Sequence, residues 1–171
     1  MMLGMSLQTF TLVHVLISLV GIATGFVVMF EIISGKWSNA WTAIFLITTV
    51  ATSVTGFGFP FEHVTPAHIV GVISLLILAI AIPALYVFKL AGSWRWIYVI
   101  GATLALYLNF FVLIVQSFLK VPALKALAPK QTEPPFLVAQ SAALVLFIVL
   151  GTLAVKRSGG DRAAQARVGG K

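Results

Sequence analysis

The chain has no cysteine and few charged residues. Its 171 residues include four acidic residues and three histidines, and charged residues make up 9% of the whole. Without cysteine, disulfides, thiolate metal ligands, iron–sulfur clusters and haem attached through thioethers are excluded. Hydrophobic residues account for 60% of the chain. A soluble domain of this length needs far more polar surface, so the composition predicts an integral membrane protein.

Acidic and basic residues are also absent from the middle of the long apolar stretches. Ion-coupled carriers and proton relays usually keep an ionisable residue there, so this absence argues against both. A retinal Schiff base needs a buried lysine and is excluded. The net charge of +7 does not indicate a nucleic-acid partner, because the basic residues lie at the ends of apolar stretches and in the tail.

Several apolar stretches approach or exceed the length of about 20 residues that a transmembrane helix needs. The sequence therefore predicts an all-α bundle of about five transmembrane helices within residues 1–155. The predicted spans are residues 8–33, 41–57, 67–88, 95–118 and 136–155. Residues 156–171 are basic and glycine-rich, which predicts a flexible cytoplasmic tail.

The basic residues are divided unequally between the two predicted sides of the membrane. Three of the eleven, Lys120, Lys125 and Lys130, fall in the connector before the last span, and the other eight fall on the side of the C-terminus. The positive-inside rule then places the C-terminus in the cytoplasm and the N-terminus outside the inner (plasma) membrane. The four tryptophans lie at the predicted inner ends, as in an interfacial aromatic belt: Trp37, Trp41, Trp94 and Trp96.

Two histidines lie on the same predicted side of the membrane. His14 is near the start of the first span and His68 near the start of the third, and these spans run parallel. Histidines from two helices at similar depth can ligate a haem iron from both faces. Ser18, Gly21 and Gly25 share a helical face with His14 and would leave clearance for a porphyrin. A haem b with His14 and His68 as axial ligands is therefore one candidate cofactor site.

Uncharged polar residues also gather in the predicted outer half of the fourth and fifth spans. Asn109 and Gln116 share a face of the fourth span, and Gln140 lies near the start of the fifth. Their amides can hydrogen-bond a quinone carbonyl, which makes quinone a second candidate cofactor. Aromatic residues that could line a haem edge or a quinone cleft are Phe57, Phe59, Phe61, Tyr107, Phe110 and Phe111.

The connector between the second and third spans offers a further alternative, a divalent-metal site. Glu62 and His63 are adjacent, and His68 and Glu133 would complete a set of donors. This spacing lacks the regular helical repeat of strong metal motifs. The same residues also fit an ordinary interfacial loop, in which Thr65 caps a helix that begins at Pro66.

Each candidate residue also fits a role in helix packing. Gly21–Gly25 forms a GxxxG motif, which more often marks close helix contact than a cofactor. The sequence favours a small accessory or assembly subunit of the inner membrane without catalysis of its own. Its partners would be the lipid bilayer and other membrane subunits or a second copy. The alternatives are a b-type haem carrier that exchanges electrons with quinol, and a facilitated transporter of a neutral solute along the hydroxyls of the second span.

Overall fold

The computed structural model describes residues 5–59 and 66–168, and within these ranges the chain is helical, without β-strands. Its six α-helices are α1 (Leu7–Ile33), α2 (Asn39–Gly56), α3 (Pro66–Tyr86), α4 (Trp94–Lys120), α5 (Pro122–Leu127) and α6 (Pro134–Val168). Among the described residues, four helical segments are long and apolar enough to cross a membrane: Leu7–Ile33, Ala67–Tyr86, Trp94–Lys120 and Pro134–Ser158. The protein is therefore an apolar helical bundle with four candidate membrane-spanning helices.

The helix predicted at residues 41–57 is present as α2 but is not among these four. Its 18 residues include five threonines, a serine and an asparagine, which lower its hydropathy. The helices α1 to α4 all begin and end within two residues of the predicted boundaries. The helical prediction for this region is thus confirmed, and the crossing of the membrane by α2 stays a prediction.

The last helix is longer than the predicted span. α6 continues to Val168, whereas the span predicted from hydropathy ends at residue 155. Residues 162–168 consist largely of alanine, glutamine and arginine, which are good helix formers, so helix can continue beyond the apolar segment. The flexibility of residues 156–171 stays a prediction.

Local signals define most helix ends. Ser6 caps α1 by accepting a hydrogen bond from the Thr9 N–H at 3.1 Å, and Ser38 caps α2 in the same way. α3 ends at Tyr86, two residues before the predicted end. Lys89 and Leu90 adopt left-handed backbone angles, with φ of 49° and 58°, and turn the chain away from the helix.

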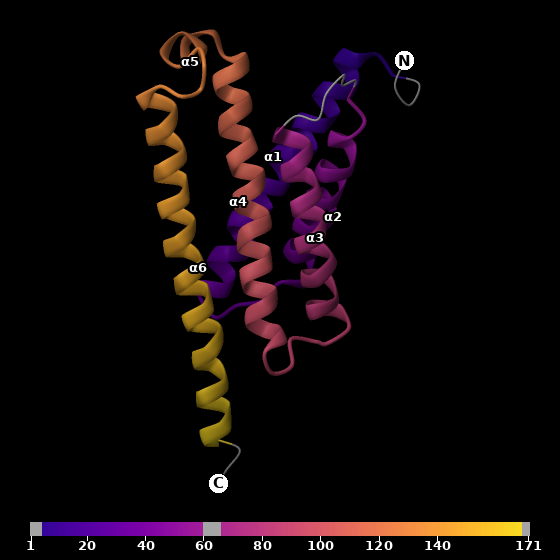
Figure 1. The fold of residues 1–171 in the computed structure, drawn as a ribbon. Helices are drawn as coiled ribbons and strands as arrows, with labels where there is room; N and C mark the ends of the chain where they lie inside the picture. The colour runs from indigo at the N-terminus through magenta and orange to yellow at the C-terminus, as the bar shows by residue number, and fades with distance from the viewer. Residues whose placement is uncertain (1–4, 60–65, 169–171) are drawn as a thin grey trace.

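The five long helices run alternately in opposite directions along the bundle (Figure 1). α1 starts at the same end as α5, and α6 finishes at the other end, beyond the turn that joins α3 to α4 (Figure 1). We call these the α5 end and the tail end. α1 packs along α2, α3 packs along α4, and α4 also packs against α6.

The tightest core lies in the middle of the bundle and toward its tail end. Met29, Phe45 and Tyr98, from α1, α2 and α4, have no exposed surface. Gly101 brings α3 and α4 together, since a Cβ at this glycine would lie 2.9 Å from the Cβ of Ala81. Close approach through small residues is how membrane helices associate, because lipid gives them little hydrophobic driving force.

Arg95 connects three parts of the tail end. Its Nη1 donates a hydrogen bond to the Ser158 carbonyl of α6 at 3.0 Å. Its guanidinium carbon lies 5.9 Å from the centre of the Trp37 ring, in the turn between α1 and α2. The tail end is therefore held together by polar as well as apolar contacts.

Candidate functional site

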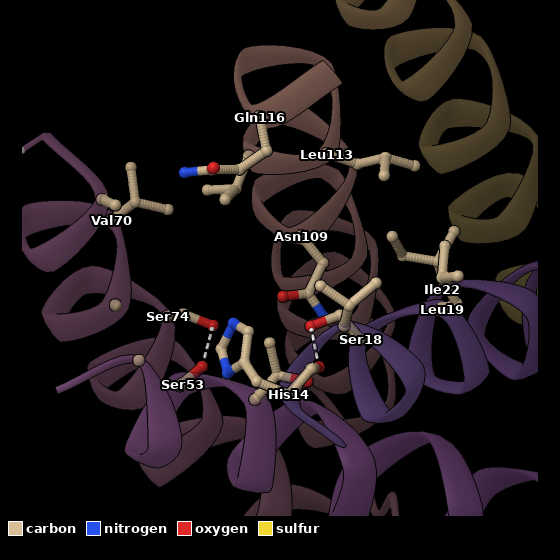
Figure 2. Close-up of a pocket in the computed structure, with 16 residues that line it drawn as sticks. His14, Ser18, Leu19, Ile22, Ser53, Val70, Ser74, Asn109, Leu113 and Gln116 are labelled. Carbon is tan, nitrogen blue, oxygen red and sulfur yellow. Dashed lines mark hydrogen bonds between the residues drawn. The ribbon is translucent and has the colours of Figure 1, made fainter. Parts of the chain in front are cut away.

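A cavity of about 120 Å³ lies nearer the α5 end, between α1, α2, α3 and α4 (Figure 2). The residues that line it in the described part of the chain include no charged side chain. Its polar lining residues are His14, Ser18, Thr52, Ser53, Ser74, Asn109 and Gln116. The other lining residues are apolar or glycine. A concave, mostly apolar site with a few placed polar groups is the usual form of a small-molecule site.

Helical spacing brings these side chains to the cavity. His14 and Ser18 are four residues apart on α1, and Asn109, Val112 and Gln116 follow one face of α4. Figure 2 shows the Asn109 side chain extending from α4 toward His14 and Ser18. The cavity thus collects polar groups from helices that are far apart in sequence.

His14 is held in position by a neighbouring helix. Its Nδ1 lies 2.8 Å from the Thr55 hydroxyl oxygen near the end of α2. Its ring also meets Phe59 edge to face, with the ring centres 5.1 Å apart. The ring nitrogen farther from the backbone points into the cavity (Figure 2). His14 therefore presents one nitrogen to Thr55 and leaves the other for a ligand.

Two polar atoms at the cavity have no hydrogen-bond partner in the described part of the chain. They are the Asn109 amide nitrogen and the Thr52 hydroxyl oxygen, both almost completely covered by neighbouring protein atoms. Other lining hydroxyls are satisfied: Ser18 donates to the His14 carbonyl at 2.8 Å, and Ser53 bonds Ser74 at 3.2 Å (Figure 2). Buried polar groups are nearly always paired, so unpaired ones around a cavity indicate a bound molecule.

The structure brings together four of the predicted site residues and separates the others from them. His14, Ser18, Asn109 and Gln116 all line the cavity. His68 does not line it; its ring lies 5.8 Å from that of Phe57. Gln140 lies at the contact of α6 with α4, where its Nε2 donates to the Phe111 carbonyl at 3.3 Å. The three amides predicted to bind a quinone therefore do not share one site.

The glycines predicted to leave room for a porphyrin face other side chains. A Cβ at Gly21 would lie 3.1 Å from the Thr48 hydroxyl oxygen, and one at Gly25 would lie 2.5 Å from Leu106 Cδ1. Both glycines therefore serve close helix packing. The cavity is also well below the 300 Å³ or so at which pockets for drug-sized ligands begin, and a porphyrin is larger still. This geometry gives the haem prediction no support.

The candidate aromatic lining is likewise used for packing. Tyr107 and Phe110 each place their ring 5.6 Å from that of Phe147 on α6, and Phe110 also meets Phe26 of α1. These rings fill the space between α1, α4 and α6. Phe61 lies outside the described residues.

The predicted metal site cannot be placed, because Glu62 and His63 lie outside the described residues. Within the described part of the chain, no group of three or more metal-ligating side chains occurs. The Glu133 carboxylate instead accepts hydrogen bonds from the neighbouring backbone N–H groups of Lys130 and Thr132. Desolvation alone raises the pKa of the Glu133 carboxyl. These N–H donors and the nearby Lys130 outweigh it, so the pKa lies below its ordinary value.

Three hydroxyls of α2 bond their own helix. Thr48 donates to the Ile44 carbonyl and Thr55 to the Ala51 carbonyl, both at 2.6 Å. Ser53 bonds its own helix in the same way and also reaches Ser74. Ser53 and Ser74 line the cavity but were not predicted as site residues. A serine within a helix usually bonds its own backbone, so the sequence gives no signal for either one. Of the two α2 hydroxyls that line the cavity, Thr52 is the one without a partner in the described part of the chain.

Comparisons with protein-family models, with curated proteins and with solved structures found no match to this chain. The chemistry of the site therefore has to be inferred from its own residues.

Proposed function

We propose that this protein is a small accessory subunit of the inner membrane that binds one small, uncharged molecule in the cavity of its outer half. The observation that carries the proposal is the pair of unpaired polar atoms at the cavity, Asn109 Nδ2 and Thr52 Oγ1. A buried polar group without a partner costs about 1–3 kcal/mol, and a bound molecule that pairs with it recovers part of that cost.

The membrane topology in this proposal has five crossings, with the N-terminus outside and the C-terminus in the cytoplasm. At about 1.5 Å per residue, the 18 residues of α2 extend about 27 Å, close to the 30 Å or so of the hydrocarbon core. α2 also runs beside α1 along the bundle (Figure 1). The excess of basic residues on the C-terminal side supports the orientation.

Introduced cysteines test this orientation, because the natural chain has none. Thr132→Cys lies beside α6 at the α5 end, and Ala91→Cys lies in the turn between α3 and α4; both positions are exposed. In intact cells, a membrane-impermeant maleimide is expected to label only Thr132→Cys. Ala91→Cys should become labelled only after lysis. Labelling in the opposite order would reverse the topology.

The lining of the cavity favours a neutral ligand. It supplies amides, hydroxyls and an imidazole, and no charged side chain to pair with an ion. An ion that left water for this site would lose most of its hydration without compensation. A bound haem is not part of the proposal, because the glycine face and His68 do not contribute to the cavity.

Binding is favoured over passage because the rest of the bundle is filled. Met29, Phe45, Tyr98 and Leu106 have no exposed surface and lie beyond the cavity, toward the tail end. A solute that entered from the outer side would meet this core. The cavity is therefore a pocket with a closed floor.

The function is tested with the purified full chain in mild detergent and two probes of similar ring size. Phenol, which is neutral at pH 7, is expected to raise the resistance of the protein to unfolding. At one hundred times its dissociation constant the gain would be about 2.7 kcal/mol. Benzoate, which is charged, should give no gain. If phenol has no effect at any soluble concentration, or benzoate acts equally well, the proposed site is wrong.

A further inference from the structure

The hydrogen-bonding character of the cavity can be assigned atom by atom, starting from Thr55. The Thr55 hydroxyl oxygen lies 2.6 Å from the Ala51 carbonyl oxygen. A carbonyl has no hydrogen to donate, so the single hydroxyl hydrogen of Thr55 must lie between these two oxygens. Thr55 can then only accept in its other contact, the 2.8 Å contact with His14 Nδ1.

This contact selects the tautomer of His14. Because Thr55 accepts, His14 Nδ1 carries the hydrogen and donates it. In the neutral ring the other nitrogen, Nε2, then carries a lone pair and no hydrogen. That nitrogen is the one that points into the cavity (Figure 2). The cavity therefore offers an acceptor on the side of α1.

The opposite side of the cavity carries an amide. Asn109 on α4 extends toward His14 (Figure 2), and its amide has both a donor and an acceptor. A ligand that fits must donate to His14 Nε2, and it can pair with the Asn109 amide.

The size of the cavity limits what else the ligand carries. At about 120 Å³ the cavity is close to the roughly 150 Å³ of an engineered apolar cavity that binds benzene. Its walls between the polar groups are apolar, from residues such as Leu19, Ile22 and Val70. One ring or a short chain fits, with room for a single polar substituent.

We infer that the ligand is a hydroxyl-bearing molecule about the size of phenol; this inference rests on the proposed binding function. Its O–H donates to His14 Nε2, and its oxygen lies beside the Asn109 amide. A quinone carbonyl or an ether would bring a second lone pair to His14, whereas a phenol or quinol hydroxyl satisfies it. The site is therefore specific for the hydroxyl form of such a ring.

Three ring compounds separate this inference from the proposed function. Phenol has the donor and the acceptor, anisole keeps the oxygen without the O–H, and toluene matches the size of phenol without either. Binding is measured by equilibrium dialysis of the full chain in detergent against protein-free micelles of the same detergent, which corrects for partition into micelles. Phenol is expected to bind at least about tenfold more tightly than anisole and toluene, the ratio that corresponds to about 1.4 kcal/mol.

Two variants locate the origin of this preference. His14→Phe keeps a ring of similar shape but removes the acceptor, and it should reduce the ratio of phenol to anisole affinity to below about twofold. His68→Phe changes a histidine that does not line the cavity and should keep the wild-type ratio. If the wild-type protein binds anisole as well as phenol, the hydroxyl inference fails while the binding function stands. If none of the three probes binds, the binding function fails as well.

Discussion

Replacing Gly25 by alanine is expected to lower the free energy of unfolding by about 1–3 kcal/mol, the usual cost of an extra methyl group in a filled core. The added Cβ would lie 2.5 Å from Leu106 Cδ1 and 2.8 Å from Phe45 Cε2. Neither neighbour can move away easily, because both side chains are completely buried. Gly25→Leu is expected to prevent stable packing of α1 on α2 and α4.

The measurement is unfolding by sodium dodecyl sulfate in mixed micelles, followed by far-ultraviolet circular dichroism. Gly56→Ala is the matched control, since the nearest atom to its added Cβ would be His14 Cε1 at 3.9 Å, an ordinary contact. The control should unfold as the natural protein does. Equal stability of the Gly25 and Gly56 variants would mean that α1 does not pack closely through its glycine face.

Asn109→Leu is expected to abolish ligand binding while making the protein more stable. The leucine fills part of the cavity and removes an amide nitrogen that has no partner in the described part of the chain. Removing such an unpaired group should raise the free energy of unfolding by about 1–2 kcal/mol. The same change removes an amide that lines the cavity and leaves less room for the ligand, so the affinity for phenol should fall by at least about tenfold. A gain in stability with a loss of binding is typical of functional residues.

Gln140→Leu controls for the loss of an amide as such. Gln140 also has an unpaired buried oxygen. Its amide nitrogen donates to the Phe111 carbonyl, and the residue lies outside the cavity. Its replacement should leave the affinity for phenol unchanged. If Asn109→Leu destabilises the protein and Gln140→Leu impairs binding equally, the cavity does not have the role assigned to it.

Hydropathy was sufficient to predict the helices, because membrane helices must satisfy their backbone internally and expose apolar side chains. It placed α1 to α4 within two residues of their observed ends. α2 lies at the limit of this signal, since its threonines lower its hydropathy, although Thr48 and Thr55 donate to their own backbone. The same rule underestimated α6, whose extension depends on helix propensity and not on apolar length.

Helical spacing predicted part of the site. It placed His14 with Ser18 and Asn109 with Gln116, and all four line the cavity. It could not decide which helices face one another, and this is why His68 was grouped with His14. The side of the membrane on which a residue lies follows from the direction of its helix. Which neighbouring helix that residue faces depends on how the helices pack. The roles of Gly21 and Gly25 depended equally on what lies opposite, which is Thr48, Phe45 and Leu106.

The proposed occupant of the cavity between His14 and Asn109 is one small uncharged molecule. Nuclear Overhauser effects between phenol and the isotope-labelled protein in detergent would show whether it lies there. Contacts are expected from the phenol ring to the His14 ring and to the methyl groups of Val70 and Val112, all at the cavity. These contacts should disappear in Asn109→Leu. Contacts only to exposed apolar residues such as Leu12 and Ile47, or contacts that persist unchanged in Asn109→Leu, would contradict binding in the cavity.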